Sequence, residues 1–289
     1  MLAPAGLPAQ EIAFTWDDLP AHSALPPGES RVEIGKKLIA AMRAANMPPV
    51  YGFVNGIQTE REPLATPMLQ DWRDAGFLLG NHTWSHPNLN QQAVELWEQD
   101  LEKNEPLLQK YMPGQDWRWL RYPYLGEGDT KEKRIAVRQM LAKRGYKIAT
   151  VTMSFGDYMY NEPYARCVAK NDSAGIAKLE TAYLDAARAS IEFSRAMSKA
   201  LYSRDIPYVL LMHVGALDAR MLPRLIELYR TSGFRFVRLE DAEKDSFYQS
   251  SMDPSLALAP DSLEEAMQLR GLPLPPRPGP SIDVNAVCQ

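Results

Sequence analysis

The 289-residue sequence predicts an α/β fold built on a parallel sheet. Short apolar segments recur along the chain, and amphipathic segments lie between them. The segment Tyr208–Met212 is apolar without alternation, as is typical of a parallel strand buried on both faces. Alternating strands and helices favour a parallel sheet, and the pattern alone fits a closed barrel or an open sheet equally well.

The strands are expected where apolar residues cluster between turn-forming residues. The expected segments are Ile12–Trp16, Pro49–Val54, Phe77–His82, Trp117–Pro123, Lys147–Met153, Pro207–Val214 and Phe234–Leu239. These seven segments would supply the strands of a fold in which strands and helices alternate.

The helices are predicted from apolar residues at a spacing of three and four. Ser30–Glu33 reads as a capping box, and the apolar positions from Ile34 to Met42 fall on one helical face before Pro48 ends the helix. A long helix is expected from about Gly175 to Leu201, and another spans Leu222 to Leu228.

The composition changes after about residue 245. Five prolines accumulate between Pro273 and Pro280, and one short capped helix is expected from Asp261 to Arg270. We therefore predict a catalytic unit over residues 1–245 and a Pro-rich C-terminal extension, residues 246–289, packed on it.

The overall composition is that of a globular protein, with 45% hydrophobic and 24% charged residues. The formal net charge of −4 gives no basic surface for nucleic acid or anionic membrane. No apolar run is long enough to span a bilayer. The N-terminus, Met1 to Glu11, has no intact signal peptide, so we expect either a cytoplasmic protein or, by preference, a periplasmic or secreted one with its signal removed. The oligomeric state is left open.

The two cysteines, Cys167 and Cys288, are too few for a disulfide framework and lack the spacing of a zinc site. We interpret them as two free thiols, with a single bridge that ties down the C-terminal tail as the alternative.

Polar residues that could act in catalysis or bind metal follow the predicted strands. Asp17 and Asp18 follow the first strand, the pair His82 and His86 follows the third, and His213 follows the most apolar one. Arg121 and Asp157 come at the ends of the fourth and fifth strands. In a parallel α/β barrel the carboxyl ends of the strands converge on one rim, so these residues would meet there.

Each feature alone also has an ordinary explanation. A His-x-x-x-His pattern arises often by chance, two aspartates after a strand are often a helix cap, and a histidine at the end of a core strand is often structural. An arginine in an aromatic strand often only packs. The strand-end positions of all of them favour a shared site over these separate explanations.

The set is chemically coherent. Two imidazoles and one carboxylate suit a divalent ion such as Zn²⁺ and leave room for water. A second carboxylate beside the ion can act as general base, and a protonated histidine can protonate the leaving group. Amide or ester hydrolysis by a metal-activated water requires these components.

These segments resemble the polysaccharide deacetylase family, also called the NodB homology domain or carbohydrate esterase family 4. Its motifs run in order over roughly Ile12 to Leu239. The corresponding segments are Thr15–Leu19, His82–Pro87, Arg121–Tyr124, Asp157–Tyr158 and Leu211–His213. The second motif, His-Thr-Trp-Ser-His-Pro, matches in full.

The resemblance implies a distorted (β/α)7 barrel and a role for each matched residue. Asp18, His82 and His86 would bind one divalent metal, which we expect to be Zn²⁺, with Co²⁺, Mn²⁺ or Ni²⁺ as alternatives. Asp17 would be the general base, oriented by Arg121. His213 would be the general acid, tuned by Asp157. The Tyr124 backbone N–H would stabilise the oxyanion, and Tyr158 and Leu211 would line the acetyl pocket.

The resemblance implies an enzyme that removes acetyl groups from N- or O-acetylated carbohydrate, so the expected partner is an acetylated glycan. Leu19 replaces the usual glycine of the first motif, Pro20 comes next, and His22 lies two residues further on without an assigned role. Trp84 lies within the second motif and is interpreted either as a sugar-stacking platform or as rim packing.

Three other functions are weighed against this one. A metal-dependent amidohydrolase of the same fold would open non-sugar C–N bonds such as those of cyclic imides or ureides, and the altered first motif allows it. A silent glycan-binding module would not need both the base and the acid. A zinc protease is disfavoured because no glutamate lies between His82 and His86 and Pro87 prevents a helix.

Overall fold

The computed structural model describes residues 9–289. The first residues of the predicted catalytic unit and most of the N-terminal lead-in, Met1–Pro8, lie outside this range. Within it, seven strands form a single sheet in which every pairing is parallel. They are β1 (Gln10–Leu19), β2 (Tyr51–Val54), β3 (Leu78–Asn81), β4 (Trp119–Leu120), β5 (Lys147–Ile148), β6 (Tyr208–His213) and β7 (Phe234–Phe236). The predicted α/β fold with parallel strands is confirmed.

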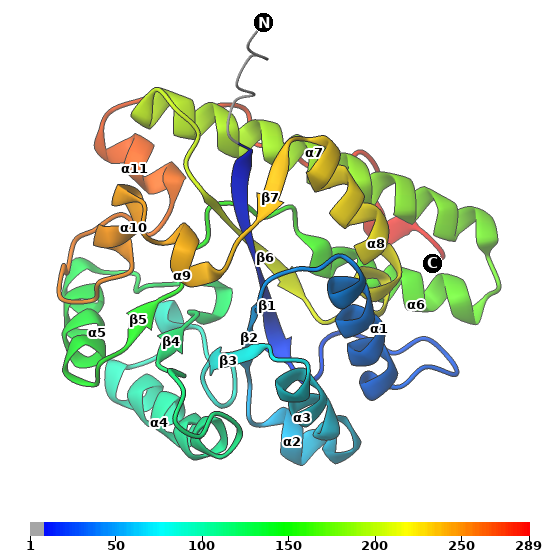
Figure 1. Ribbon diagram of the computed structural model, residues 1–289, viewed down its shortest axis with the longest axis horizontal. Coiled ribbons are helices and arrows are strands. Elements are labelled where there is room, and N and C mark those ends of the chain that lie inside the picture. Colours follow the sequence, from blue (N-terminus) through cyan, green and yellow to red (C-terminus); the bar gives the residue numbers. More distant parts are fainter. Residues whose placement is uncertain (1–8) are drawn as a thin grey trace, which may run out of the picture.

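The sheet curls into a distorted barrel around its long first strand. The strand order is β5-β4-β3-β2-β1-β6, and β7 pairs with the start of β1. Beyond β5 the chain turns back toward β6, where Met153 forms an isolated parallel bridge with Leu210. This bridge joins the two ends of the sheet. In Figure 1, β1 and β6 run side by side with their carboxyl ends downward.

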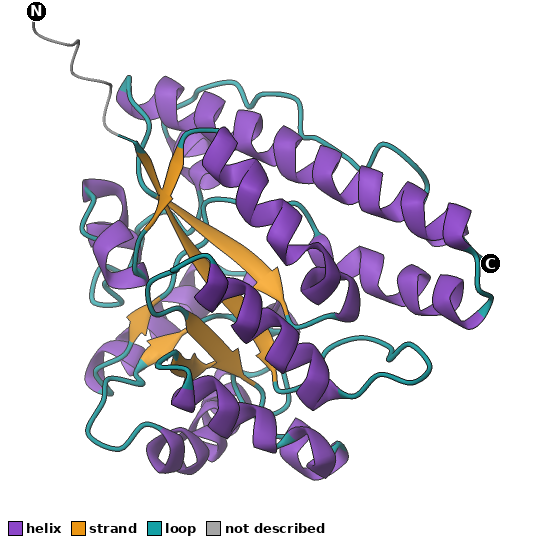
Figure 2. Cartoon of the chain, turned by 45° about the vertical axis from the view of Figure 1, so that its right-hand side comes forward, coloured by secondary structure: helices purple, strands orange, loops and turns teal. Residues whose placement is uncertain are grey.

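Helices cover the outside of the sheet (Figure 2). The α-helices are α1 (Arg31–Ala44), α2 (Gln58–Arg61), α3 (Pro67–Asp74), α4 (Val94–Tyr111), α5 (Lys131–Lys143), α6 (Asn161–Ala169), α7 (Ser173–Tyr202), α8 (Ala216–Thr231), α9 (Leu239–Ala242), α10 (Ser246–Ser251) and α11 (Leu263–Leu269). Short 3₁₀ turns are η1 (Pro63–Ala65), η2 (Leu89–Gln91), η3 (Pro123–Leu125), η4 (Asp157–Tyr160) and η5 (Val284–Ala286).

The helix predictions agree with these bounds. The predicted capping box starts α1, where the Ser30 hydroxyl accepts a hydrogen bond from the Glu33 backbone N–H at 3.2 Å. Ile34, Leu38 and Met42 of this helix are buried against the core. Burial of such side chains contributes about 1.5–3 kcal/mol each. No helix in residues 9–289 combines the length and apolarity required to traverse a bilayer.

The segment after residue 245 lies on the barrel and contains more structure than the sequence predicts. Besides α11, which packs against α7, it contains α10, whose Phe247 and Tyr248 are buried. The expectation of one short helix here is therefore wrong, because α10 is too short to show a helical repeat. Figure 1 shows the chain running on from α11 to its end beside α6.

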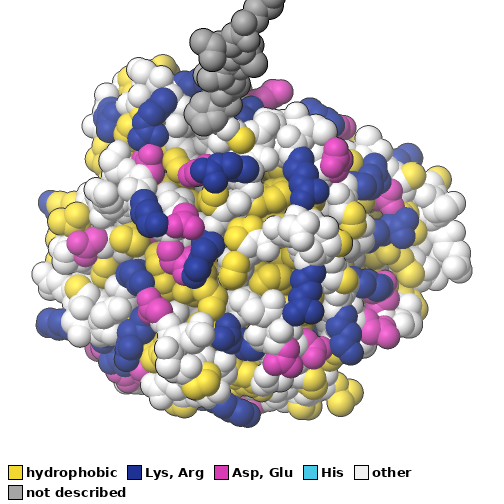
Figure 3. Space-filling model, in the orientation of Figure 1, with side chains coloured by type: hydrophobic (Ala, Val, Ile, Leu, Met, Phe, Trp, Pro, Cys, Tyr) yellow, Lys and Arg dark blue, Asp and Glu magenta, His cyan; other side chains and the backbone are white. Residues whose placement is uncertain are grey.

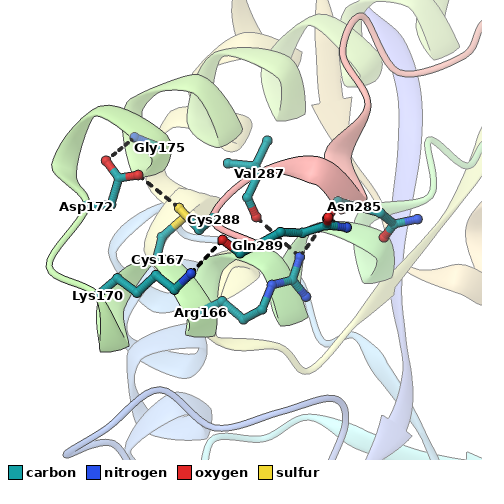
Figure 4. Close-up of a disulfide and its surroundings, with 9 residues drawn as sticks. All are labelled: Arg166, Cys167, Lys170, Asp172, Gly175, Asn285, Val287, Cys288 and Gln289. Atoms are coloured by element: carbon teal, nitrogen blue, oxygen red, sulfur yellow. Dashed lines mark hydrogen bonds between the residues drawn. A yellow bond between two sulfur atoms is a disulfide. The ribbon is translucent and has the colours of Figure 1, made fainter.

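Cys288 forms a disulfide with Cys167 of α6, so the interpretation as free thiols is wrong. Figure 4 shows the surrounding contacts, in which Arg166 donates hydrogen bonds to the carbonyls of Asn285 and Val287. The bridge closes a loop of 121 residues, a separation at which sequence spacing carries no information on pairing. On the face drawn in Figure 3, basic and acidic side chains are interspersed rather than gathered into a basic patch.

Candidate active site

The ends of β1, β3, β4 and β6 bring the predicted polar residues to one rim of the barrel. Asp17 and Asp18 lie near the end of β1, His82 follows β3, Arg121 follows β4, and His213 ends β6. Parallel pairing sets these positions side by side, since Asp17 is in register with His213 and Arg121 N–H donates to the Asn81 carbonyl. Asp157 reaches the same rim from η4, after the crossover that follows β5.

Asp18, His82 and His86 form a compact group of three potential metal ligands. One ligand atom from each lies within 4.8 Å of the others. Asp18 Oδ1 lies 3.5 Å from His82 Nε2 and 3.5 Å from His86 Nε2. A carboxylate oxygen that faces two imidazole nitrogens is the donor set that Zn²⁺ and related divalent ions prefer.

The hydrogen bonds of these residues leave the inward-facing atoms free. His82 Nδ1 lies 2.6 Å from the Arg121 carbonyl oxygen, which can only accept, so Nδ1 carries hydrogen. In the neutral imidazole, Nε2 then presents a lone pair. Asp18 Oδ1 is buried and has no hydrogen-bond partner among the described residues. Because a buried, unpartnered carboxylate oxygen is costly, these residues fit a bound divalent cation.

The surroundings of Asp18 and His86 favour the protonation states in which these residues can bind metal. Burial would raise the pKa of Asp18, but the hydrogen bond from His22 and the imidazoles of His82 and His213 outweigh it and hold the pKa well below its usual range. Burial and the neighbouring His82 lower the pKa of His86 to about 4. An ionised carboxylate and neutral imidazoles are the forms that bind metal.

Asp17 lies next to this group and is held by Arg121. Arg121 Nη1 contacts the two carboxylate oxygens of Asp17 at 3.1 and 3.3 Å. The guanidinium is itself fixed, because it also donates to the Ala149 carbonyl at 2.8 Å and to the Thr15 hydroxyl at 3.0 Å. Asp17 Oδ2 is 3.7 Å from His82 Nε2, so a fixed carboxylate borders the three-ligand group.

His213 approaches the group from the opposite side and has a different partner. Its Nδ1 lies 3.0 Å from Asp157 Oδ1, and its backbone N–H donates to Asp157 Oδ2 at 2.6 Å. Burial would lower the pKa of His213, but the charge and hydrogen bond of Asp157 raise it to about 10. His213 Nε2 lies 4.0 Å from Asp18 Oδ2, within reach of a molecule bound at the three-ligand group.

Comparison with known families agrees with this arrangement. The polysaccharide deacetylase model matches residues 5–161, more than half of the chain. The chain belongs to the polysaccharide deacetylase family. The matched span contains the three-ligand group, Asp17, Arg121 and Asp157, whereas His213 lies beyond it. No curated protein matches the chain.

Several solved structures, among them deacetylases, have a fold similar to that of this chain. The chitin deacetylase from the fungal pathogen Colletotrichum lindemuthianum is 20% identical, with a TM-score of 0.51 over 83% of this chain and 92% of that chain. A peptidoglycan deacetylase from Bacillus subtilis is 18% identical, with a TM-score of 0.51 over 82% and 92%. A mutant carbohydrate esterase family 4 pseudoenzyme with restored activity is 15% identical, with a TM-score of 0.54 over 83% and 72%.

The backbone around the three-ligand group adopts an unusual conformation. Asp18, Thr83, His86 and Tyr124 have φ angles of 64°, 63°, 60° and 58°, in the left-handed region that non-glycine residues rarely adopt. Each such residue costs on the order of 1–3 kcal/mol and persists only where its surroundings fix it. Concentration of this strain in three motif segments is typical of a functional site.

Three buried asparagines fix the loop that carries His82. Asn55 donates to the carbonyls of His82 and Thr83 at 2.6 and 3.3 Å, and the Asn81 side-chain oxygen accepts from the Thr83 N–H at 2.8 Å. Asn104 of α4 donates to the Asn81 side-chain oxygen at 3.0 Å. Asn55 and Asn104 were not predicted from the sequence, since isolated polar residues give no motif of their own.

The residues predicted to contact substrate take different positions. Tyr124 is 67% exposed with its ring 4.6 Å from that of His86, and Tyr158 is 49% exposed with its ring 5.3 Å from that of His213. Leu211 is buried in β6. Trp84 lies against Gly56, with the Lys103 ammonium 4.3 Å from its ring centroid, a placement that favours rim packing.

A polar hollow opens over the three-ligand group. Its volume is about 310 Å³, and its lining includes Asp18, His22, His86 and Tyr124. Residues of α2 form part of the wall, among them Gln58 and Arg61. A polar hollow over potential ligands suits a hydroxyl-rich substrate better than an apolar one.

Proposed function

We propose that the chain is a metal-dependent deacetylase that hydrolyses acetyl groups on N- or O-acetylated carbohydrate. One observation carries the proposal: the three-ligand group lies between the fixed Asp17 carboxylate and the His213–Asp157 pair. This arrangement supplies a cation site, a proton acceptor and a proton donor within one rim, as acyl hydrolysis requires.

Asp18, His82 and His86 would hold a single divalent ion, for which Zn²⁺ is our first choice and Co²⁺, Mn²⁺ and Ni²⁺ are alternatives. When bound, the ion would lower the pKa of water and polarise the acyl carbonyl. The Arg121 carbonyl would fix the ring orientation and tautomer of His82, as outer-shell partners of metal ligands do.

Asp17 would take a proton from the attacking water. Because Arg121 contacts both carboxylate oxygens, the carboxylate is held in one orientation instead of rotating among several. The oxygen of the water then forms a bond to the acyl carbon, and the proton resides on Asp17. Positioning of this kind removes orientational entropy from the reaction step.

His213 would complete the reaction by protonating the leaving group. Asp157 raises the pKa of His213 to about 10, so the imidazole carries its proton at neutral pH. As the bond between the acyl carbon and the sugar nitrogen or oxygen breaks, His213 Nε2 donates its proton to that atom. Acetate and a free amine or hydroxyl on the sugar are the products.

The remaining predicted residues would shape the acyl site. Tyr158 and Leu211 would contact the acetyl methyl group, and the Tyr124 backbone N–H would donate to the oxyanion. We propose the same division of the chain as above, with residues 1–245 as the catalytic unit and 246–289 as an extension. The alternative substrates, cyclic imides and ureides, gain no support from the matched family or the similar structures.

Metal-reconstituted protein tests the proposal directly. The chain is stripped with a chelator and reloaded with Zn²⁺, Co²⁺, Mn²⁺ or Ni²⁺. It is then assayed for acetate release from chitin oligomers, peptidoglycan fragments and acetylated xylan, and for ring opening of cyclic imides. We expect release from at least one acetylated glycan, abolished by chelation and restored by metal. Acetate release that survives exhaustive chelation would remove the metal from the mechanism, and turnover of imides alone would replace the substrate class.

A further inference from the structure

We propose that His22 is a positioning residue of the three-ligand group, which holds the Asp18 carboxylate in the orientation that binds metal. This inference rests on the proposed function, because it assigns His22 a task only if Asp18 is a ligand. It assigns a role to a histidine that lies outside the matched family motifs and that the mechanism above does not use. His22 Nδ1 lies 2.9 Å from Asp18 Oδ2.

The two oxygens of Asp18 face different groups. Oδ1 faces the two potential ligand histidines, His82 and His86, each at 3.5 Å, and has no hydrogen-bond partner within residues 9–289. Oδ2 faces away from that pair toward His22 and, at 4.0 Å, His213. A hydrogen bond to Oδ2 therefore fixes the rotation of the carboxylate and keeps Oδ1 directed at the imidazoles.

His22 is itself held in place by the loop that follows β1. Ala21 N–H donates to the Asp18 carbonyl at 3.0 Å, which closes a tight turn and returns the chain over Asp18. The Arg31 guanidinium donates to the carbonyls of His22 and Ser23 and is paired with Glu62 at 2.8 Å. This loop begins at Leu19, which replaces the glycine of the family motif, and Pro20.

His22 acts on the ligand and is not a fourth ligand. The nitrogens of His22 do not belong to the compact group of ligand atoms, which among the described residues comprises Asp18, His82 and His86. Its Nδ1 must carry hydrogen to bond the Asp18 carboxylate, and its Nε2 is buried without a partner. The His22 ring also lies 4.8 Å from the His213 ring, so it limits the space into which Oδ2 could rotate.

Three substitutions of His22 separate the effect of its hydrogen bond to Asp18 from the effect of its side-chain volume. His22→Leu removes the donor, His22→Asn can place an amide N–H near the former Nδ1, and His22→Gln places it farther out, near the former Nε2. We expect His22→Leu and His22→Gln to bind Zn²⁺ about 10- to 100-fold more weakly than wild type, the usual effect of losing an outer-shell partner, and His22→Asn to recover most of the affinity.

The measurement is Zn²⁺ affinity by competition with a chromophoric chelator, with circular dichroism of the metal-free variants to verify folding. Ser23→Ala is the matched control, because the bond from Arg31 uses the backbone carbonyl that this variant retains. Since His22 acts through Asp18, excess Zn²⁺ should restore most of the turnover of His22→Leu. The Co²⁺ absorption spectrum should change in the Leu and Gln variants and return toward wild type in Asn.

The outcomes distinguish this inference from the proposed function. Wild-type affinity in His22→Leu, or equal affinity in the Asn and Gln variants, would overturn the positioning role while leaving the metal site intact. A wild-type chain that binds none of Zn²⁺, Co²⁺, Mn²⁺ and Ni²⁺ would overturn the proposed function and this inference with it. Should the Leu variant fail to fold, the contrast between Asn and Gln still decides the matter.

Discussion

Two histidines on the same rim of the barrel, His82 and His213, have different surroundings that suit them to different roles. His82 and His213 are both buried or nearly so, and both use Nδ1 for a hydrogen bond within the protein. The partner of His82 Nδ1 is the neutral carbonyl of Arg121, whereas the partner of His213 Nδ1 is the carboxylate of Asp157. A buried charge beside an imidazole stabilises the protonated form, and a carbonyl does so far less.

The difference decides what each ring can do. His213, with its pKa raised to about 10, keeps a proton on Nε2 and can donate it. His82 presents a bare Nε2 toward Asp18 Oδ1 and can bind a cation. Proton donation and metal binding are thus separated by the partner of Nδ1, not by the residue type.

The largest effect is expected on the metal-binding side. His82→Ala removes one of three ligands, so Zn²⁺ affinity should fall by more than the roughly 100-fold seen for outer-shell losses, and acetate release should fall to background. Equilibrium dialysis with metal analysis measures the first, and the acetate assay the second. Retention of stoichiometric Zn²⁺ in this variant would show that His82 is no ligand.

Asp17→Asn should separate proton transfer from metal binding. The variant retains Asp18, His82 and His86, so it should bind Zn²⁺ like wild type. It loses the proton acceptor, and turnover should fall about 100- to 10,000-fold, the usual range for general base catalysis. Parallel measurement of metal content and kcat tests this, and equal metal loss in Asp17→Asn and His82→Ala would contradict the division of labour.

The pH profile tests the His213 side. In wild type, His213 stays protonated until the pH approaches about 10, so its contribution to the rate is lost only above that value. In Asp157→Asn the largest raising contribution is lost, while burial and the weaker raising charges of Asp18 and Asp17 remain. The pKa should therefore fall from about 10 toward the usual imidazole value of about 6.5. The alkaline limb of kcat/KM should therefore move to lower pH by several units.

Asp218→Asn is the matched control for this shift. Asp218 is a buried carboxyl group close enough to Asp157 to be affected by its charge. It accepts hydrogen bonds from Asn161 and Tyr183, both at 2.7 Å. Burial and the charge of Asp157 raise its pKa well above the ordinary value, so Asn should remove less negative charge here than at Asp157. Its alkaline limb should stay near wild type, and an equal shift in both variants would mean that Asp157 has no specific effect.

The smallest effect on the site is expected from the C-terminal disulfide. Cys288→Ser opens a loop of 121 residues and should lower the free energy of unfolding by about 2–5 kcal/mol, as measured by denaturant titration. Because both histidines are held by barrel residues, Zn²⁺ affinity and the pH profile should not change. A shifted pH profile in this variant would show that the tail contributes to the environment of His213.

Much of the fold followed from local patterns. All seven strands lie within or overlap the predicted apolar segments, and α1 begins at its predicted cap. The segment Lys147–Met153 is instructive, because it was predicted as one strand although β5 ends at Ile148. Its later residues are buried because they cross to β6 at Met153, and hydrophobicity cannot show which neighbour a strand will pair with.

The residues of the candidate site could be predicted from the sequence, whereas the hydrogen bonds that hold them could not. Asp17, Asp18, His82, His86 and His213 stand in motifs at strand ends, so the chain order alone marked them. The partners that set their states come from distant segments without a motif, such as Asn55 or Asn104 behind the His82 loop. His22 lies only four residues from Asp18, yet nothing in the sequence shows that a turn returns it to the carboxylate.

The sequence by itself determined the strand-and-helix repeat and the residues brought to the rim, because burial periodicity and side-chain type are local properties. Only the tertiary structure decided which Nδ1 meets a carbonyl and which a carboxylate, and which oxygen of Asp18 stays free. Protonation and ligand orientation depend on distances of a few ångströms between segments far apart in the chain. The folding of the barrel fixes those distances.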